Sequence, residues 1–241
     1  MKPLEEEGCL WCFDQAKLRW ERLEPADSKA AYPEGRSYHA MTSDGQDMIY
    51  LHAGCPASGR LADLWSFSIG SREWRRLADA PPPARGGASL AFADGKVWRM
   101  NGFDGKTEQG FALGVYHPET DRWSTRSWAV ETGPSPRSVC TLLPVKIAGK
   151  EMLVTMFGES DPSNAGHMGA GKMSGDVWAY DVEADEWQRV ETEVKGGGDQ
   201  PAARGWFAAD VIPGKRNTIV VQGGLGEDNE RLGDVWVLEF Q

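Results

Sequence analysis

A tryptophan recurs at nearly regular intervals along the chain, each time after a short strand-like run that carries another aromatic residue. Successive copies are separated by 54, 49 and 64 residues. The recurring segments end at Trp20, Trp74, Trp123 and Trp187. A fifth copy, residues 234–240, stops before its tryptophan. A period of about 50 residues with strand pattern inside each unit is typical of a β-propeller, because one small sheet cannot bury its faces alone.

Two further landmarks keep the same order in every unit. An arginine opens a strand of small residues, and a second, apolar strand then ends on a glycine. The arginines are Arg36, Arg85, Arg137 and Arg204, and the glycines are Gly54, Gly102, Gly158 and Gly224. Glycine at a strand end supplies a positive φ for the turn and lets neighbouring loops approach closely. Each unit is therefore predicted to contain an arginine strand, a glycine strand, an aromatic strand and a tryptophan strand.

This pattern predicts an all-β fold, a propeller of four-stranded antiparallel blades in one domain over residues 1–241. The expected complete blades span residues 36–78, 85–125 and 137–190, with a half blade at 10–24 and an incomplete, three-stranded blade at 204–241. A generic antiparallel β-sandwich is the alternative. Sandwiches do not repeat a tryptophan at a fixed place, so the propeller is preferred.

The two ends of the chain pose a closure problem, because the last expected blade has no tryptophan strand. Residues 19–24 have the pattern of such a strand, and propellers commonly close by borrowing one strand from the opposite terminus. Residues 10–14, however, have the pattern of an aromatic strand of the same blade. We expect either a shortened member of a larger propeller class or completion by another copy or partner, and we favour the first. Exposed blade edges would invite association into homo-oligomers.

Composition limits the possible partners. The net charge is −10, with 26 basic and 36 acidic side chains. Nucleic acid and anionic membranes need a basic face, so we expect neither as a partner. The first residues lack the apolar core of a signal peptide, and no run approaches the roughly 18 apolar residues of a membrane span. We expect a cytoplasmic protein.

The four cysteines are too few and too scattered for a disulfide framework, in agreement with a reducing compartment. Cys9 and Cys12 form a C-x-x-C pair, but no second ligand pair is spaced for a structural zinc site. Two small residues beside an edge strand are the preferred interpretation. No nucleophile elbow, phosphate-binding loop or dinucleotide fingerprint occurs, so hydrolase, nucleotide and nicotinamide chemistry have no support.

The longest connection between a glycine strand and an aromatic strand, residues 158–176, is the segment richest in side chains that could bind a metal or take part in catalysis. It contains Glu159, Asp161 and His167 within nine residues. Two carboxylates and an imidazole form the ligand set of a facial triad for ferrous iron, with coordination positions left open for substrate. The same donors accept several divalent metals. The alternative is a solvated acidic loop whose histidine packs on glycines.

The order of arginine, glycine, aromatic and tryptophan strands resembles the kelch family over nearly the whole chain from Leu10. A more specific resemblance follows from "ARGG", "GKVW", "PSPRSV", the spacing of Glu159 and His167, and "RGW". These segments look like those of the plant nitrile-specifier, epithiospecifier and thiocyanate-forming proteins, which are six-bladed kelch propellers. The resemblance implies that this chain is a shortened form that lacks the first blade and a half.

In that family an E-x3-D-x3-H motif binds ferrous iron, which directs the breakdown of glucosinolate aglycones toward nitriles and related products. Glu159 and His167 stand at the family spacing. Ser163 occupies the position of the aspartate, and Asp161 lies two residues earlier. The resemblance therefore implies Fe²⁺ as cofactor, with Glu159, His167 and either Asp161 or Ser163 as its ligands.

The resemblance also implies a substrate site. Arg60 falls where the family has an arginine that contacts the anionic aglycone, and a guanidinium is well shaped for sulfate. Tyr38 replaces an aromatic residue of the substrate pocket, and Trp206 matches another. The alternatives are a solvated loop charge for Arg60 and packing between blades for Tyr38 and Trp206.

Two functions from different classes remain. The first is an iron-dependent lyase or isomerase that acts on a small anionic molecule at the loop face of the propeller. The second is a non-catalytic kelch module whose exposed loops bind a protein partner. Bound metal would distinguish the two. A lectin-like or oxidase role ranks third, and the oxidase would need copper ligands that cannot be assembled from this sequence.

Overall fold

The computed structural model describes residues 3, 5–163 and 169–241, and these residues form strands and loops without a helix. The described part of the chain accordingly offers no helix of the length and apolarity that crossing a membrane requires. All paired strands are antiparallel neighbours in small separate sheets. The prediction of an all-β propeller is confirmed.

Three sheets have four strands each, in the order expected from the repeat. The first contains β3 (Ala40–Ser43), β4 (Met48–His52), β5 (Leu64–Ser68) and β6 (Glu73–Leu77). The second contains β7 (Ser89–Ala93), β8 (Lys96–Met100), β9 (Ala112–His117) and β10 (Arg122–Ser127). The third contains β11 (Leu143–Ile147), β12 (Lys150–Met156), β15 (Val177–Asp181) and β16 (Glu186–Arg189).

The remaining strands form smaller sheets. A three-stranded sheet contains β17 (Ala208–Val211), β18 (Thr218–Leu225) and β19 (Arg231–Glu239). A hairpin of β1 (Leu10–Asp14) and β2 (Arg19–Leu23) precedes the first complete sheet, and the pair β13 (Glu159–Asp161) and β14 (Lys172–Met173) lies in the loop after β12. The predicted three full blades, one three-stranded blade and one half blade are therefore present.

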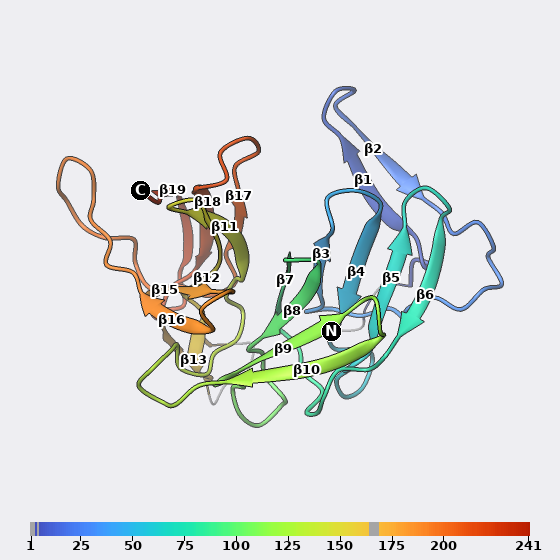
Figure 1. Ribbon diagram of the computed structural model, residues 1–241, viewed down its shortest axis with the longest axis horizontal. Coiled ribbons are helices and arrows are strands. Elements are labelled where there is room, and N and C mark those ends of the chain that lie inside the picture. Colours follow the sequence, from blue (N-terminus) through green and yellow to red (C-terminus); the bar gives the residue numbers. More distant parts are fainter. Residues whose placement is uncertain (1–2, 4, 164–168) are drawn as a thin grey trace.

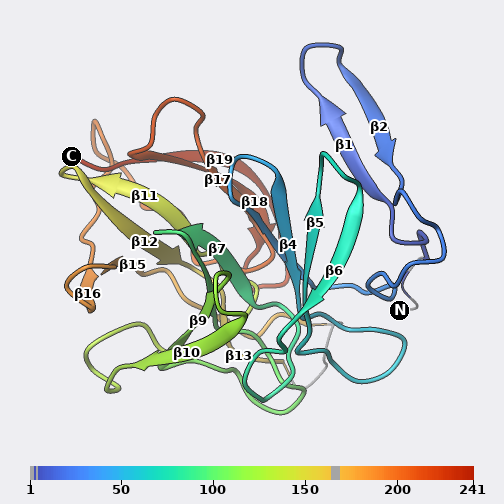
Figure 2. The same ribbon diagram turned by 45° about the vertical axis from the view of Figure 1, so that its right-hand side comes forward.

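The sheets stand side by side in an arc (Figures 1 and 2). The first strand of each sheet packs against the first strand of the next, from β3 through β7 and β11 to β17. The β1–β2 hairpin and the β17–β19 sheet lie at opposite ends of the arc in both views. The segment at residues 19–24 contains β2, which pairs with β1, so it does not close the last sheet within the described chain.

The recurring tryptophan packs on the aromatic residue of the neighbouring third strand. Ring centroids are 4.9 Å apart for Phe67 and Trp74, and 5.1 Å apart for Tyr180 and Trp187. This contact gives each blade an apolar outer layer and explains why both residues recur together. The interior between blades is filled by apolar side chains such as Trp98, whose ring is fully buried.

The recurring arginine is buried and ties together the backbone of its own blade. Its Nε donates to the carbonyl oxygen two residues earlier, and its Nη1 donates to the carbonyl of the residue before the recurring glycine. The Nε acceptors are Glu34, Pro83, Ser135 and Ala202, and the Nη1 acceptors are Ala53, Asn101, Phe157 and Gly223. One side chain therefore fixes both loops at the start of each blade.

Three of these arginines also bind a carboxylate through both Nη atoms. The pairs are Arg36 with Asp63, Arg137 with Asp176 and Arg204 with Asp234, each with a shortest N–O distance of 2.6 Å. The aspartate in turn accepts the indole N–H of the tryptophan two residues later, at 2.6–2.7 Å. The hydrogen bonds from Arg204 and Trp236 lower the pKa of Asp234 to about 2, because they stabilise its charged form.

The second complete sheet departs from this arrangement. Ala112 stands at the position of the aspartate and Gly114 at that of the tryptophan. The missing indole leaves room for Arg99, whose Nε would lie 3.1 Å from a Cβ at Gly114. Without a carboxylate partner, burial lowers the pKa of Arg85 to about 10 and that of Arg99 to about 9.

We expect Asp176→Asn to destabilise the fold by about 3 kcal/mol, because it leaves the fully buried Arg137 without a counter-charge. The free energy of unfolding, measured by urea titration at pH 7, tests this. Asp199→Asn, in an exposed loop, is the matched control and should stay within about 0.5 kcal/mol of the parent. Equal stability of the two variants would contradict the structural role of the ion pair.

Candidate functional site

A pocket of about 270 Å³ opens on the face of the arc where loops from all four larger sheets converge. The loops that follow the recurring arginines and the recurring glycines supply most of its lining. The pocket is therefore made of equivalent positions from successive repeats, and its chemistry depends on which side chains stand there.

The residue two positions after each recurring arginine adopts the left-handed conformation. These residues are Tyr38, Gly87, Val139 and Trp206, with φ of 55°, 63°, 48° and 52°. Gly87, Val139 and Trp206 each donate their backbone N–H to the carbonyl of the counterpart in the preceding blade, at 2.9, 3.0 and 3.1 Å. All four line the pocket. This belt of linked turns explains why Tyr38 and Trp206, although 168 positions apart, reach the same cavity.

The residue after each recurring glycine forms a second set of equivalent positions. Cys55, Phe103 and Glu159 form isolated antiparallel bridges with Ser37, Gly86 and Ser138, which follow the recurring arginines. Cys55, Phe103 and Glu159 also line the pocket. A thiol, an aromatic ring and a carboxylate thus enter the pocket from three neighbouring blades.

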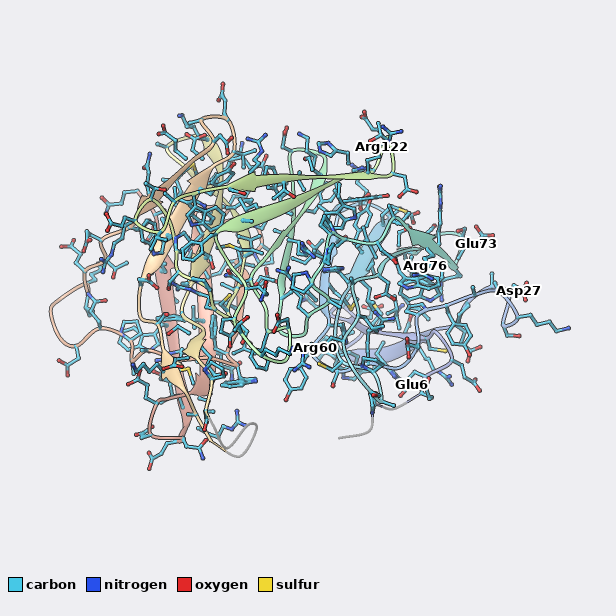
Figure 3. The ribbon with its side chains drawn as sticks, turned by 90° about the horizontal axis from the view of Figure 1, so that it is seen from below. Glu6, Asp27, Arg60, Glu73, Arg76 and Arg122 are labelled. Carbon is cyan, nitrogen blue, oxygen red and sulfur yellow. The ribbon has the colours of Figure 1, made fainter. Side chains whose placement is uncertain are left out.

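Arg60 lies in the loop between β4 and β5, near the middle of the molecule in Figure 3, whereas Arg76 and Arg122 lie toward its outer edge. Its guanidinium lies over the Phe103 ring, 5.1 Å from the centroid. It also covers Gly105, where a Cβ would approach Nη1 to 2.7 Å. Within the described residues its buried Nε has no hydrogen-bond partner. The guanidinium is therefore held against the wall of the pocket by packing.

Lys106 lines the same pocket from the loop between β8 and β9. The pocket consequently carries two cationic side chains, Arg60 and Lys106, on loops of adjacent blades. Two cations beside an aromatic ring favour an anionic ligand with a planar or apolar part.

Glu108 is a further titratable residue beside the pocket, and no feature of the sequence marks it. Its Oε1 accepts a hydrogen bond from Ser138 Oγ at 3.1 Å, and its buried Oε2 has no partner among the described residues. Burial raises its pKa to about 8, against the opposing effect of the Ser138 hydrogen bond, and the charges of Glu159 and Asp104 add to the rise. Glu108 therefore holds a proton at neutral pH.

The predicted metal ligands do not all face the same space. Glu159 is buried, lines the pocket, and accepts the N–H of Gly171 at 2.8 Å on Oε1. Asp161 lies beyond an irregularity in the β13–β14 pairing and lines a second, shallow recess beside Lys172. Its carboxylate is 67% exposed and 3.8 Å from Lys172 Nζ. Ser163 lines both spaces.

His167 lies outside the described residues. Among the residues that the structure does describe, no three metal-ligating side chains converge on one point. Glu159 is the predicted carboxylate ligand that lines the pocket, and one carboxylate does not hold iron alone. The described residues by themselves therefore do not fit an iron site.

The structure brings five of the seven predicted site residues to one pocket, namely Tyr38, Arg60, Glu159, Ser163 and Trp206. Sequence reasoning missed Gly87, Val139, Phe103 and Lys106, which also line it. The position two residues after the recurring arginine could have identified Gly87 and Val139, since Tyr38 and Trp206 stand at the same place in their own repeats.

We expect Glu108→Gln to change the pH dependence of stability. A carboxyl whose folded pKa lies above its unfolded value stabilises the fold at low pH, and this contribution is lost as the pH rises toward about 8. Because glutamine does not titrate, the variant should gain about 4 kcal/mol relative to the parent between pH 5 and pH 8.5. Urea unfolding at both pH values measures this difference.

The control for this experiment is Glu119→Gln, in an exposed turn. Its stability relative to the parent should be the same at both pH values. A Glu108→Gln difference that does not vary with pH would contradict a protonated Glu108.

Comparison with known proteins agrees with this architecture. A model of the KLHDC2/KLHL20/DRC7 Kelch-repeats domain matches residues 4–158. A protein of Thlaspi arvense named N-(sulfonatooxy)prop-2-enimidothioate sulfolyase is 28% identical over 98% of this chain and 70% of its own length. The Leucine-zipper-like transcriptional regulator 1 homolog of Drosophila melanogaster is 24% identical over 86% of this chain and 20% of its own length.

An F-box/kelch-repeat protein of Arabidopsis thaliana is 21% identical over 89% of this chain and 44% of its own length. The chain thus spans less than half of the length of two of these three relatives. The matched Kelch-repeats model covers more than half of the chain, and the described residues form successive small antiparallel sheets. The chain therefore belongs to the kelch-repeat family.

Proposed function

We propose that this chain binds a small anionic molecule in the pocket and acts on it as a lyase of the specifier type. The relative from Thlaspi arvense, named as a sulfolyase, supports the reaction class. Its substrate, as named, carries a sulfonatooxy group, which is an anion that a sulfolyase separates from the rest of the molecule. We propose a substrate of the same class, an organic molecule that carries a sulfonatooxy group, and we propose that the shape of the pocket selects its organic part.

The observation that carries this proposal is the position of Arg60. Its guanidinium packs against Phe103 and Gly105 in a pocket that also contains Lys106, and its Nε has no hydrogen-bond partner among the residues that the structure describes. A guanidinium binds a sulfate group through two parallel hydrogen bonds, and an ammonium adds a second positive charge. As the bond to the sulfate group breaks, negative charge grows on the departing oxygen. Fixed cations stabilise that charge more than they stabilise the bound substrate.

The ligand also needs an apolar surface to receive its organic part, and the left-handed turn residues of the belt supply it. Tyr38 and Trp206 contribute rings and Val139 an apolar side chain to the lining of the pocket. Burial of apolar surface against these groups contributes roughly 25 cal/mol per Å² and would orient the ligand between them and Arg60. We propose these three residues as the determinants of substrate shape.

Ferrous iron enters this proposal through the resemblance to specifier proteins. The residues proposed to hold it are Glu159 and His167, with Ser163 as a neighbouring oxygen donor. When bound, the metal would supply Lewis acidity or one-electron chemistry toward the sulfur-bearing part of the substrate. The roles given above to Arg60, Lys106 and the turn residues do not require it.

The alternative function is a non-catalytic module that binds a protein through the same loops. Two of the relatives are named as a transcriptional regulator homolog and as an F-box/kelch-repeat protein, and the chain matches only 20% and 44% of their lengths. The small, cation-bearing pocket favours the small-molecule proposal over this alternative. We place either function in the cytoplasm, since the four cysteines of the chain are free.

We expect Arg60→Met to reduce kcat/KM for N-(sulfonatooxy)prop-2-enimidothioate by roughly 30-fold, because the change removes about 2 kcal/mol of charge-assisted hydrogen bonding. Release of inorganic sulfate above the uncatalysed rate, with product identification by mass spectrometry, measures it. Arg76→Met is the matched control, since Arg76 is exposed on the outer strand β6 and should leave the rate unchanged. Equal losses in both variants, or no catalysis by the parent, would contradict the proposal.

We expect the protein, loaded anaerobically with ferrous iron and desalted, to retain about one iron per chain, and Glu159→Ala and His167→Ala to retain almost none. Asp161→Ala should retain iron, because its carboxylate lies in the separate recess. Elemental analysis measures all four. Equal trace iron in the parent and the variants would remove the metal from the proposal and leave the Arg60 test standing.

A further inference from the structure

We propose that the second complete sheet binds a small free carboxylate, of the size of formate, beside Arg85 and Arg99. The ligand takes the place that an aspartate side chain holds in the other three repeats. Arg85 and Arg99 are not among the residues that line the pocket, so the proposal does not depend on the sulfolyase reaction. The equivalent positions in the other sheets define the geometry of the site.

In three repeats the recurring arginine holds a carboxylate with both of its Nη atoms. The Nη1–Oδ1 distance is 2.6 Å in each, and the Nη2–Oδ2 distances are 2.8, 3.2 and 2.9 Å. The indole N–H of the third strand donates to the same carboxylate. A carboxylate at this position therefore accepts hydrogen bonds from a guanidinium and an indole. The carboxylates are those of Asp63, Asp176 and Asp234.

The second sheet retains the arginine but has no aspartate. Arg85 Nε donates to the carbonyl of Pro83 at 3.2 Å and Nη1 to that of Asn101 at 3.0 Å, as in the other repeats. Ala112 stands at the place of the aspartate, and within the described residues Arg85 Nη2 makes no hydrogen bond. An alanine side chain and a free formate together have the same heavy atoms as an aspartate side chain. Formate thus supplies the group that the substitution removes.

A second cation stands in the space of the indole. Arg99 on β8 pairs with Gly114 on β9, and its Nε would lie 3.1 Å from a Cβ at Gly114. Arg99 Nη1 donates to the carbonyl of Pro81 at 3.1 Å, and the buried Nε has no partner among the described residues. Arg99 therefore offers an N–H donor where the other repeats have the indole. Uncharged residues occupy its position in the other three sheets, namely Leu51, Thr155 and Val221.

The two guanidinium groups have an electrostatic need for an anion. Arg85 and Arg99 are only 7% and 6% exposed, and the positive charge of Arg85 adds to the effect of burial in lowering the pKa of Arg99. Asp104 acts on Arg85 in the opposite direction, but its Oδ1 accepts the N–H groups of Lys106 and Thr107, each at 2.8 Å. A carboxylate bound beside both arginines offsets their desolvation and their mutual repulsion.

The position is open to a ligand from solvent. The aspartate side chains that occupy it in the other repeats are 11%, 23% and 39% exposed, and Ala112 is half-buried. The planar fork of a guanidinium binds the two oxygens of a carboxylate in parallel, which a spherical ion such as chloride cannot reproduce. The site should therefore prefer formate to chloride.

Titration of the ¹⁵N-labelled protein with sodium formate tests the site directly. The Nε–H signal of Arg99, identified by its loss from the Arg99→Met variant, should shift with formate and reach saturation, because the ligand gives this N–H a partner. Sodium chloride at equal ionic strength should not produce the shift. A signal that does not move in formate, or that moves equally in chloride, would overturn the proposal.

Ala112→Asp supplies the carboxylate covalently, as in the first complete sheet. In this variant the Arg99 signal should no longer respond to formate. Ala184→Asp is the matched control, since it adds the same charge in an exposed turn, and it should respond like the parent. A formate response that survives unchanged in Ala112→Asp would contradict the assigned position.

Urea unfolding provides a second measurement, which does not require the Ala112→Asp variant to fold. Formate at ten times the dissociation constant from the titration should raise the folding equilibrium constant of the parent about elevenfold over chloride of equal ionic strength. Arg99→Met should bind formate about tenfold more weakly, because one of the two cations is lost, so the same concentration should give a rise of about twofold. Equal rises in the parent and in Arg99→Met would refute a site that uses both arginines.

Discussion

The buried arginine at the start of each blade is the interaction on which the rest of the structure depends. It binds the carbonyl groups of two loops and, in three blades, the carboxylate two residues before the tryptophan of the third strand. These loops are the ones that form the pocket. The cost of burying a guanidinium is therefore offset by backbone and carboxylate partners that simultaneously fix the positions of functional side chains. Stability and site geometry have the same physical origin here.

Much of the fold could be predicted from the sequence, because each blade repeats an aromatic pair that is also a contact. Phe67 with Trp74 and Tyr180 with Trp187 are such pairs, so their spacing counts the blades. The functional site was harder to predict from the sequence than the fold. The irregularity between Glu159 and Asp161 places Asp161 in a separate recess, and spacing along the chain does not predict a break in strand pairing. Glu108 was missed because its raised pKa comes first from burial in the folded chain and then from the charge of Glu159, which is distant in sequence.

The second complete sheet shows how far a blade can depart from the repeat and still fold. Ala112 and Gly114 replace the aspartate and the tryptophan, and Arg99 fills the space of the indole and lies over the Trp123 ring, 5.5 Å from its centroid. The space of the indole is still filled, whereas the carboxylate of the other blades has no counterpart. Packing is therefore the stricter requirement between blades, and an ion pair can be absent from one blade when its neighbours retain theirs.

The belt of left-handed turns affects how such a pocket can change by amino-acid substitution. Its hydrogen bonds use backbone atoms alone, so the scaffold does not constrain which side chain stands at each turn. Tyrosine, glycine, valine and tryptophan accordingly occupy equivalent positions. Gly87 is the member without a side chain, and an added Cβ would come within 3.1 Å of Val139 Cγ1. The volume available to a ligand thus depends in part on the absence of a side chain at Gly87. A single gain of bulk at that place would narrow the cavity and displace the Val139 side chain by a small amount.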